Sequence, residues 1–395
     1  MSPSKTPAAT GAAIPLTFVD EAESFELVST LDALTEPTPA GRRLVREAYR
    51  DFVYEAVTSW WQGRVGGPCA ASWDYGLHVR EGPTELCQIG PAWWFPRYGV
   101  LIDARGRVPR APAGEAIHAW PRLEPLPGIG VEGEASTFTP PKDVIALPAT
   151  SIALPWGMSN YGHFVYDALA SILALEETGL LERFPLAVPP LTAWQRGLIR
   201  LVFPDVSMRE VREPVVQLEA AVFSTAMDHV LHMPGPLVMR LRERVRACAR
   251  ANDHGRRIYI SRRSQHMRVM VDEPLLEAAL AARGFEIIRP ERLSVAEQIA
   301  LFREASVIVG ASGAGLANVL FADAGARVIE IQPQNFTSFW VAATCRLVGL
   351  EWSGFFCASP GASSEAPLLS RLRRGFRFAY RLDVAAFMAF LDSRL

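Results

Sequence analysis

The sequence predicts an α/β protein of two domains that are joined by a short linker and enclose a cleft. Three observations support this fold class. The chain has 395 residues, too many for one ordinary hydrophobic core. From about residue 150 onward, short apolar runs alternate with segments whose apolar residues recur at helical spacing, which is typical of parallel sheets with right-handed crossovers. A polar stretch over 251–256 divides this alternation and predicts the linker.

These observations divide the chain into five parts. Residues 1–20 are expected to form a mobile tail and 21–250 an N-terminal domain. The linker over 251–256 leads into a C-terminal α/β domain over 257–360. The last part, 361–395, contains a predicted final helix that could pack back on the N-terminal domain.

The elements expected in the N-terminal domain change character along the chain. Helical spacing over 40–62 predicts a helix, and the Pro-, Gly- and Trp-rich stretch up to about 150 predicts irregular or antiparallel β structure. Beyond it, strands and helices alternate. The expected strands end near 155 or cover 185–188 and 220–223, and the expected helices cover 162–177, 192–203 and 236–250.

In the C-terminal domain the alternation of strand and helix is clearest. Ligands of such sheets bind at the carboxyl ends of the strands, so residues that directly follow a strand are the candidates for a site. The expected strands are 257–262, 285–290, 306–311 and 326–331, and the expected helices are 272–283, 294–305 and one that begins at 313.

Composition narrows the class of protein. Forty Lys and Arg against 42 Asp and Glu give a net charge of −2, which argues against a nucleic-acid partner. No apolar run is long enough for a secretory signal or a membrane span, and the five cysteines form no CxxC pair. The expectation is therefore a cytoplasmic protein. Because no Asp-x-Asp occurs, no metal is expected.

A glycine-rich turn follows the strand 306–311. Gly313 and Gly315 lack Cβ atoms where a ligand could approach the backbone, and N–H groups at a helix start attract anions such as a diphosphate. Glu330, at the end of the next strand, could accept the ribose hydroxyls. The alternative is a turn whose glycines serve only the packing of helix on strand.

Arginines follow the first strand of the C-terminal domain. Arg262 and Arg263 close the strand, and Arg268 lies shortly after it. Guanidinium groups offer planar, permanently charged forks for phosphate oxygens. The alternative is a solvated loop that pairs with Glu273 or Glu277.

A histidine and an aspartate lie at the start of a predicted helix. His163 and Asp167 are four residues apart, so they share one helix face. A carboxylate beside an imidazole raises its basicity and fixes its tautomer, as a general base requires. The alternative is a helix capped by Asn160 with a histidine satisfied in the core.

Two looser features leave alternatives open. Tryptophans gather in the first 160 residues and could stack on sugars, although such clusters more often supply core area. A basic run near the end could contact anionic lipid headgroups or a phosphorylated acceptor, although a solvated face is the simpler interpretation. The tryptophans are Trp60, Trp61, Trp73, Trp93, Trp94, Trp120 and Trp156, and the run is Arg371, Arg373, Arg374, Arg377 and Arg381.

Three of these blocks, in this order, resemble glycosyltransferase family 61, and the bacterial capsular-polysaccharide biosynthesis members are the most similar. The resemblance covers about 150–335. Two positions differ from the family pattern, since Ser312 stands in place of a histidine and Asp272 in place of an asparagine. The matching residues are Asn160, His163, Asp167, Arg262, Arg268, Glu273, Glu297-Gln298-Ile299, the turn from Gly310 to Asn318, and Glu330.

The resemblance implies a GT-B architecture of two facing Rossmann-like domains. It implies an inverting, metal-independent transfer of a sugar from a nucleoside-diphosphate donor, UDP-linked, to a hydroxyl of a growing capsular or exopolysaccharide glycan or glycolipid. His163 would be the base and Asp167 would orient it, with no cofactor. The residues implied to bind the nucleotide sugar are Asn160, Arg262, Arg268, Ser312, Gly313, Ala314, Gly315, Asn318 and Glu330.

Other functions stay open at this point. Because Ser312 replaces a histidine, the chain could be a non-catalytic nucleotide-sugar-binding or scaffold subunit of a polysaccharide assembly complex. Because Gly310, Gly313, Gly315 and Glu330 also fit a dinucleotide pattern, it could be an NAD(P)-binding oxidoreductase, although no Tyr-x-x-x-Lys supplies reductase chemistry. Donor hydrolysis without an acceptor is a third alternative.

Overall fold

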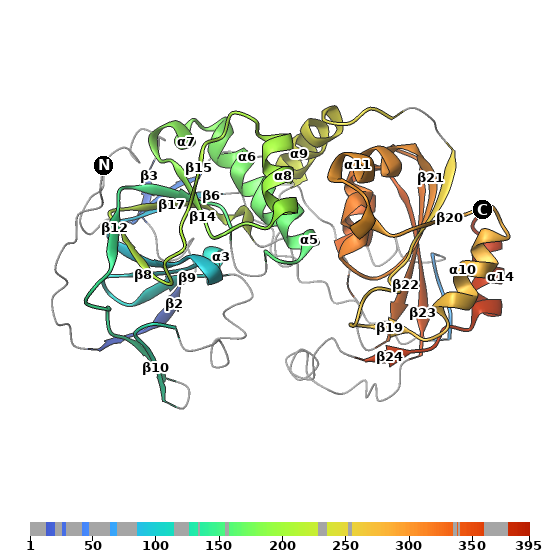
Figure 1. Ribbon diagram of the computed structural model, residues 1–395, viewed down its shortest axis with the longest axis horizontal. Helices are drawn as coiled ribbons and strands as arrows, with labels where there is room; N and C mark the ends of the chain where they lie inside the picture. The colour runs from blue at the N-terminus through green and yellow to red at the C-terminus, as the bar shows by residue number, and fades with distance from the viewer. Residues whose placement is uncertain are drawn as a thin grey trace. The chain divides into compact units, whose positions relative to one another are not determined.

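The computed structural model is a mixed α/β protein in which the chain divides into two compact units (Figure 1). One unit comprises Met1–Val53 and Val79–Leu241, and the other comprises Tyr54–His78 and Arg242–Leu395. Each unit is described by itself. The structure describes residues 13–19, 26–28, 42–46, 64–68, 85–113, 126–132, 135–154, 158–227, 235–251, 255–334, 338, 340–358 and 378–395.

The C-terminal unit contains a six-stranded parallel sheet in the order β20-β18-β21-β22-β23-β5. Numbered along the chain from β18, the first five strands lie in the order 2-1-3-4-5, one of the two common doubly wound orders. The strands are β18 Arg256–Ile260, β20 Glu286–Ile288, β21 Ala305–Ala311, β22 Arg327–Pro333, β23 Glu351–Cys357 and β5 Val65–Gly66. The strand β5 arrives from a segment that the sequence analysis placed in the N-terminal domain.

Helices cover both faces of this sheet. Figure 1 shows α11 on one side of the strands and α10 with α14 on the other. The helix α11 begins at Val295, because Ser294 before it and Glu297 form a reciprocal capping box. The turn predicted to open a helix at 313 instead forms a 3₁₀ helix, η8. The helices are α10 Glu273–Ala281, α11 Val295–Glu304, η8 Ala314–Phe321, α12 Trp340–Val348 and α14 Val384–Asp392.

Alternation along the strands decides which residues meet which helices. In β22, Ile329 and Ile331 join the core cluster that contains α10 and α14 residues such as Leu276 and Phe387. Residues between them on the strand, including Glu330, point to the opposite face. Both faces are apolar and buried, as expected for a parallel sheet covered by helices.

The N-terminal unit is built around a seven-stranded sheet in the order β15-β14-β13-β17-β6-β4-β3. Its first four strands are parallel and lie in the chain order 3-2-1-4, a Rossmann-like half, and β6 extends them antiparallel to β17 and β4. These strands are β13 Thr150–Ile152, β14 Leu186–Val188, β15 Met208–Glu210, β17 Ala221–Ser224, β6 Glu85–Ile89, β4 Arg42–Arg46 and β3 Glu26–Val28.

The other elements of this unit are smaller sheets and helices. The antiparallel β structure predicted before residue 150 is confirmed where β7, Ala92–Phe95, pairs with β8, Val100–Asp103. The further sheets have the orders β12-β16-β7-β8, β1-β11-β10 and β2-β9. Their other strands are β12 Ile145–Leu147, β16 Val216–Leu218, β1 Ile14–Pro15, β11 Ala135–Phe138, β10 Ile129–Glu132, β2 Thr17–Val19 and β9 Arg107–Pro109. Helices α5 Tyr161–His163, α6 Leu169–Glu177, α8 Ala193–Val202 and α9 Gly235–Ala247 match predicted ones.

Two predictions on the N-terminal part need correction. The helix expected over 40–62 is wrong at Arg42–Arg46, because these residues pair with Glu85–Ile89 as a strand, and the rest of that range is outside the described residues. Of the tryptophans, Trp94 is buried in the core and Trp93 packs edge-on against Phe138. These two supply core area, and the other five lie outside the described residues.

The basic run near the C-terminus is described only at Arg381, whose exposed guanidinium pairs with Asp272 at 3.1 Å. The other four arginines of the run are outside the described residues. Across the described ranges, every helix is too short or too polar to reach from one side of a bilayer to the other.

Candidate functional site

Two predicted blocks meet at the carboxyl edge of the C-terminal sheet. Strands β18 and β21 are neighbours, with Ile260 opposite Gly310. The next strand of this sheet along the chain, β20, pairs with the other edge of β18. The strand order therefore reverses between β18 and β21. Ligands of open α/β sheets bind at such a point. Arg262 follows one of these strands and Gly313 follows the other.

The Arg262 guanidinium packs directly against Gly313. A Cβ atom on Gly313 would lie 1.7 Å from Nη1 and 2.7 Å from Cζ of Arg262. The space left by the missing side chain is therefore filled by this guanidinium. A Cβ on Gly315 would lie 3.0 Å from Cγ2 of Ile260. In this structure both Cβ positions face the chain's own side chains.

The loop that carries Arg262 is held by buried polar groups. The Arg262 N–H donates to Oε1 of Glu273 at 2.7 Å, and the Tyr259 hydroxyl donates to the same oxygen at 2.8 Å. Burial raises the pKa of Glu273, and these two donors oppose the rise. The guanidinium donates through Nη2 to the Met267 carbonyl at 3.0 Å, while its buried Nε has no partner among the described residues. A buried N–H group without an acceptor is unfavourable, so this position favours a ligand that supplies an acceptor oxygen.

A second guanidinium lies close to the first. Arg268 has a left-handed backbone with φ of 52°. Burial, and then the charge of Arg262, lowers the pKa of Arg268 to about 10, and Tyr380 opposes this shift. Two like charges in a partly buried place repel each other, and an anion between them would relieve that repulsion. The pair is therefore suited to bind phosphate oxygens.

The neighbouring Arg263 behaves differently. Its Nη1 lies 3.1 Å from Oε2 of Glu277, and its side chain is 46% exposed. The alternative of a solvated arginine paired with Glu277, a residue of α10, therefore describes Arg263. The Arg262 guanidinium instead lies against Gly313 and a carbonyl.

Asn318 and Ser312 are buried beneath the turn. The Asn318 amide donates to Oε1 of Gln298 at 2.9 Å, and Gln298 donates to the carbonyls of Pro290 and Leu293. Asn318 thus joins η8 to the loop after β20. The Ser312 hydroxyl lies 3.3 Å from that of Ser338 and is 1% exposed. Contact of Asn318 or Ser312 with a donor stays a prediction from the sequence.

Glu330 is also enclosed. It lies in the middle of β22, is fully buried, and accepts a hydrogen bond from Trp352 Nε1 at 3.0 Å. Its carboxylate does not reach the surface in this structure, and the ribose contact stays a prediction from the sequence. Burial raises the pKa of Glu330 to about 7, and the bond from Trp352 opposes the rise.

Substituting Glu330 with glutamine should remove a pH dependence of stability. The carboxyl titrates near 4.5 when unfolded and near 7 when folded, so the folded state binds its proton more tightly. This stabilisation, about 3 kcal/mol, is complete below the unfolded pKa and is lost as the pH rises through the folded pKa. Urea unfolding of both proteins between about pH 5 and pH 8 measures it. The wild type should lose stability relative to E330Q, and a constant difference would contradict the prediction.

In the N-terminal unit, His163 and Asp167 follow β13, and β13 and β17 flank the point where the strand order of that sheet reverses. The Asn160 side chain caps the helix by accepting from Gly162 N–H at 2.8 Å. His163 Nδ1 lies 2.9 Å from Oδ2 of Asp167. The side chains are 15% and 2% exposed, so the imidazole reaches solvent and the carboxylate supports it from within.

A π-helical turn, Phe164–Ala168, follows His163, contains Asp167 and leads into α6. The Leu169 N–H donates to Phe164 O. Such turns occur often at functional sites. They place more residues in each turn than an α-helix, so the side chains of His163 and Asp167 come nearly above one another. With Nδ1–H donating to the carboxylate, Nε2 carries the lone pair of a general base.

Sequence reasoning found the arginines, the glycine turn and the histidine pair, but it missed residues that shape them. Tyr380 contributes to the environment of both Arg262 and Arg268, and it belongs to β24, Ala379–Tyr380, which pairs with β19, Val269–Met270. Trp352 comes from a neighbouring strand. Neither carried a motif. In the part of the chain that the structure describes, no three His, Cys, Asp or Glu side chains gather as metal ligands would.

The family model Glycosyltransferase 61 matches residues 161–329. This segment is similar to glycosyltransferase family 61. The match begins one residue after Asn160 and ends one residue before Glu330, so it contains the His163 pair, Arg262 and the glycine turn. The similarity supports glycosyltransferase activity and, in general terms, a nucleotide-sugar donor and a glycan acceptor. No curated protein matches the chain.

Proposed function

We propose that the protein is an inverting, metal-independent glycosyltransferase that uses a UDP-linked sugar. The observation that carries the proposal is the buried Arg262 guanidinium against Gly313, with Arg268 beside it, at the order reversal of a doubly wound sheet. In this proposal, the diphosphate binds the two guanidinium groups and the backbone of the turn at Ala314. The two arginines supply the positive charge that a metal ion provides in other enzymes.

The proposed reaction is a single displacement. His163 Nε2 takes the proton of an acceptor hydroxyl as that oxygen attacks the anomeric carbon. The bond from this carbon to the diphosphate breaks, and the electron pair leaves with UDP. Charge develops on the departing oxygen, so donors already fixed at Arg262 and Arg268 lower the barrier. Attack from the side opposite the leaving group inverts the anomeric centre.

The wider proposal places the donor in the C-terminal unit and the acceptor in the N-terminal unit of a GT-B arrangement. Its acceptor is a growing capsular or exopolysaccharide glycan in the bacterial cytoplasm, with the option of peripheral association with the membrane. Similarity to the family supports the glycan acceptor in general. The burial of Glu330 removes one support of the NAD(P) alternative, because that pattern requires the acid to reach ribose.

Calorimetric titration of the full chain with UDP tests the donor site. Charge-assisted hydrogen bonds contribute about 1.5–3 kcal/mol, so Arg262→Gln should weaken UDP binding about 10- to 100-fold. Arg263→Gln is the matched control, because this neighbouring arginine is exposed and paired with Glu277, and its affinity should stay within about twofold of wild type. Equal UDP affinity in the R262Q variant, or binding of NADH in place of UDP, would overturn the proposal.

A further inference from the structure

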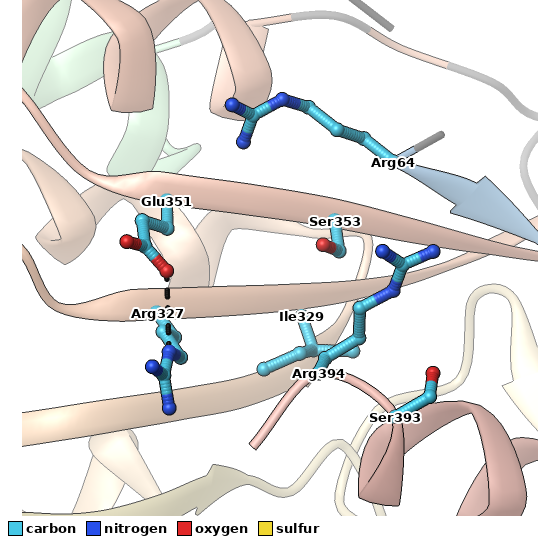
Figure 2. A pocket seen from close by; sticks show the side chains of 7 residues that line it. All are labelled: Arg64, Arg327, Ile329, Glu351, Ser353, Ser393 and Arg394. Atoms are coloured by element: carbon cyan, nitrogen blue, oxygen red, sulfur yellow. Dashed lines mark hydrogen bonds and ion pairs between the residues drawn. The ribbon is translucent and has the colours of Figure 1, made fainter. Parts of the chain in front are cut away.

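A polar cavity lies in the C-terminal unit, away from the carboxyl ends of the strands and from Arg262. It has a volume of about 390 Å³ (Figure 2). Arg327 and Glu351, which line it, begin β22 and β23, whereas Arg262 and Gly313 follow the ends of their strands. The polar residues that line the cavity are Arg64, Arg327, Glu351, Ser353, Ser393 and Arg394.

Positive charge dominates the wall of this cavity. Its lining holds three arginines and one acid, Glu351. That acid is already bound to Arg327, with Nε 3.1 Å from Oε2. Arg327 also donates through Nη1 to the main-chain oxygen of Leu395 at 2.6 Å. The cavity therefore favours an anion, because its guanidinium groups outnumber the carboxylate that could balance them.

Arg394 supplies an unsatisfied donor. Its Nε is buried and has no hydrogen-bond partner among the described residues, and its guanidinium carbon lies 4.9 Å from the centre of the Phe390 ring. Figure 2 shows its guanidinium group directed towards the side of the cavity that carries Ser353. A buried N–H without an acceptor is costly, and an oxyanion would satisfy it.

Capping of α14 does not account for this side chain. An arginine after a helix often binds the last carbonyls of that helix. Here the Ser393 hydroxyl donates to Phe390 O at 2.6 Å, and the Arg394 backbone N–H donates to Leu391 O at 2.8 Å. The end of the helix is thus bonded by groups other than the Arg394 guanidinium.

The short strand β5 builds one wall of the cavity. It pairs with β23 at Gly354 and Phe355, and the Gly354 N–H donates to Arg64 O at 3.0 Å. A Cβ on Gly66 would lie 2.6 Å from the Phe390 ring, so glycine permits this close approach. Arg64 and Arg394 therefore reach the cavity through two segments that both pack on Phe390.

We infer that this cavity binds an oxyanion, a phosphate or a sugar carboxylate, on a small polar molecule. The Arg394 guanidinium and the Ser353 hydroxyl provide the donors, and Arg64, whose Nη1 lies 3.5 Å from the Trp352 carbonyl oxygen, adds positive charge to the wall. The polar wall suits a ligand that carries hydroxyl groups beside its charge. The inference does not depend on the proposed function, since the residues of the two sites are different.

The test is titration of the full chain with inorganic phosphate and, separately, with glucuronate, at constant ionic strength. Arg394→Gln and Arg64→Gln should each weaken binding roughly tenfold, and Glu351→Gln should strengthen it by removing an acid from the wall. Arg283→Gln is the control, because this arginine is exposed and pairs with Asp392, one residue before Ser393. Its affinity should match wild type.

The Arg262→Gln variant separates this site from the proposed donor site. Inorganic phosphate can also bind the guanidinium pair of Arg262 and Arg268, so the R262Q variant should lose only that additional binding. Glucuronate should bind to R262Q as to wild type, and the tighter of the two ligands at the cavity identifies the class of anion. The inference is overturned if neither anion binds, if affinity is unchanged in both the R394Q and R64Q variants, or if it is lost in the R262Q variant alone. A failure of UDP binding would leave these outcomes unaffected, so the two proposals fail separately.

Discussion

Replacing His163 with alanine will lower the turnover number for sugar transfer about 10²- to 10⁴-fold, the usual contribution of a positioned general base. The imidazole is 15% exposed and bonded through Nδ1 to a nearly buried carboxylate, so Nε2 is oriented for proton transfer. UDP affinity should stay close to wild type, because the donor contacts lie on other residues. Steady-state kinetics and calorimetry together measure the two effects.

Two further measurements distinguish a base from a structural histidine. Added imidazole should restore part of the activity of the H163A variant, since a small base can enter the space that the side chain leaves. Asp167→Asn should also lower the turnover number strongly, because the amide carries no charge and its NH2 group can donate to Nδ1 and hold the imidazole in the wrong tautomer. Near-full turnover of H163A without imidazole would exclude the assignment.

The second large effect is expected for Gly313→Ala. The new Cβ would lie 1.7 Å from Arg262 Nη1, so the guanidinium must leave its position. The φ of Gly313 is 166°, extended backbone that alanine also adopts, and the effect is therefore one of contact. UDP affinity should fall about as much as in the R262Q variant, roughly 10- to 100-fold.

A double-mutant cycle tests whether the two residues act together. If Gly313 matters because it makes room for Arg262, the double variant G313A/R262Q should bind UDP no more weakly than R262Q alone. Gly197→Ala is the matched control. It lies within α8, has no neighbouring atom within 4 Å of its Cβ position, and should leave affinity unchanged. Additive losses of UDP affinity in the double variant would show that the two residues act independently and would contradict the prediction.

Much of the fold could be predicted because its signals are local. The capping box at Ser294 and the alternation of apolar runs with helical segments located α11 and its neighbouring strands. The prediction failed at Arg42–Arg46, where helical spacing suggested a helix but the segment pairs with β6 in a sheet. Local preference was overruled there by strand pairing with residues 39 to 47 positions away.

The sequence by itself determined which side chains could meet. Parallel strands end at one edge, so Arg262 and the glycine turn must lie near each other, and a spacing of four places His163 beside Asp167. Only the tertiary structure decided what these groups touch. Trp352 encloses Glu330, Gln298 binds Asn318, and Arg262 fills the space at Gly313. Burial depends on which distant segments pack over a residue. The spacing of apolar residues within one segment does not show which segments those are.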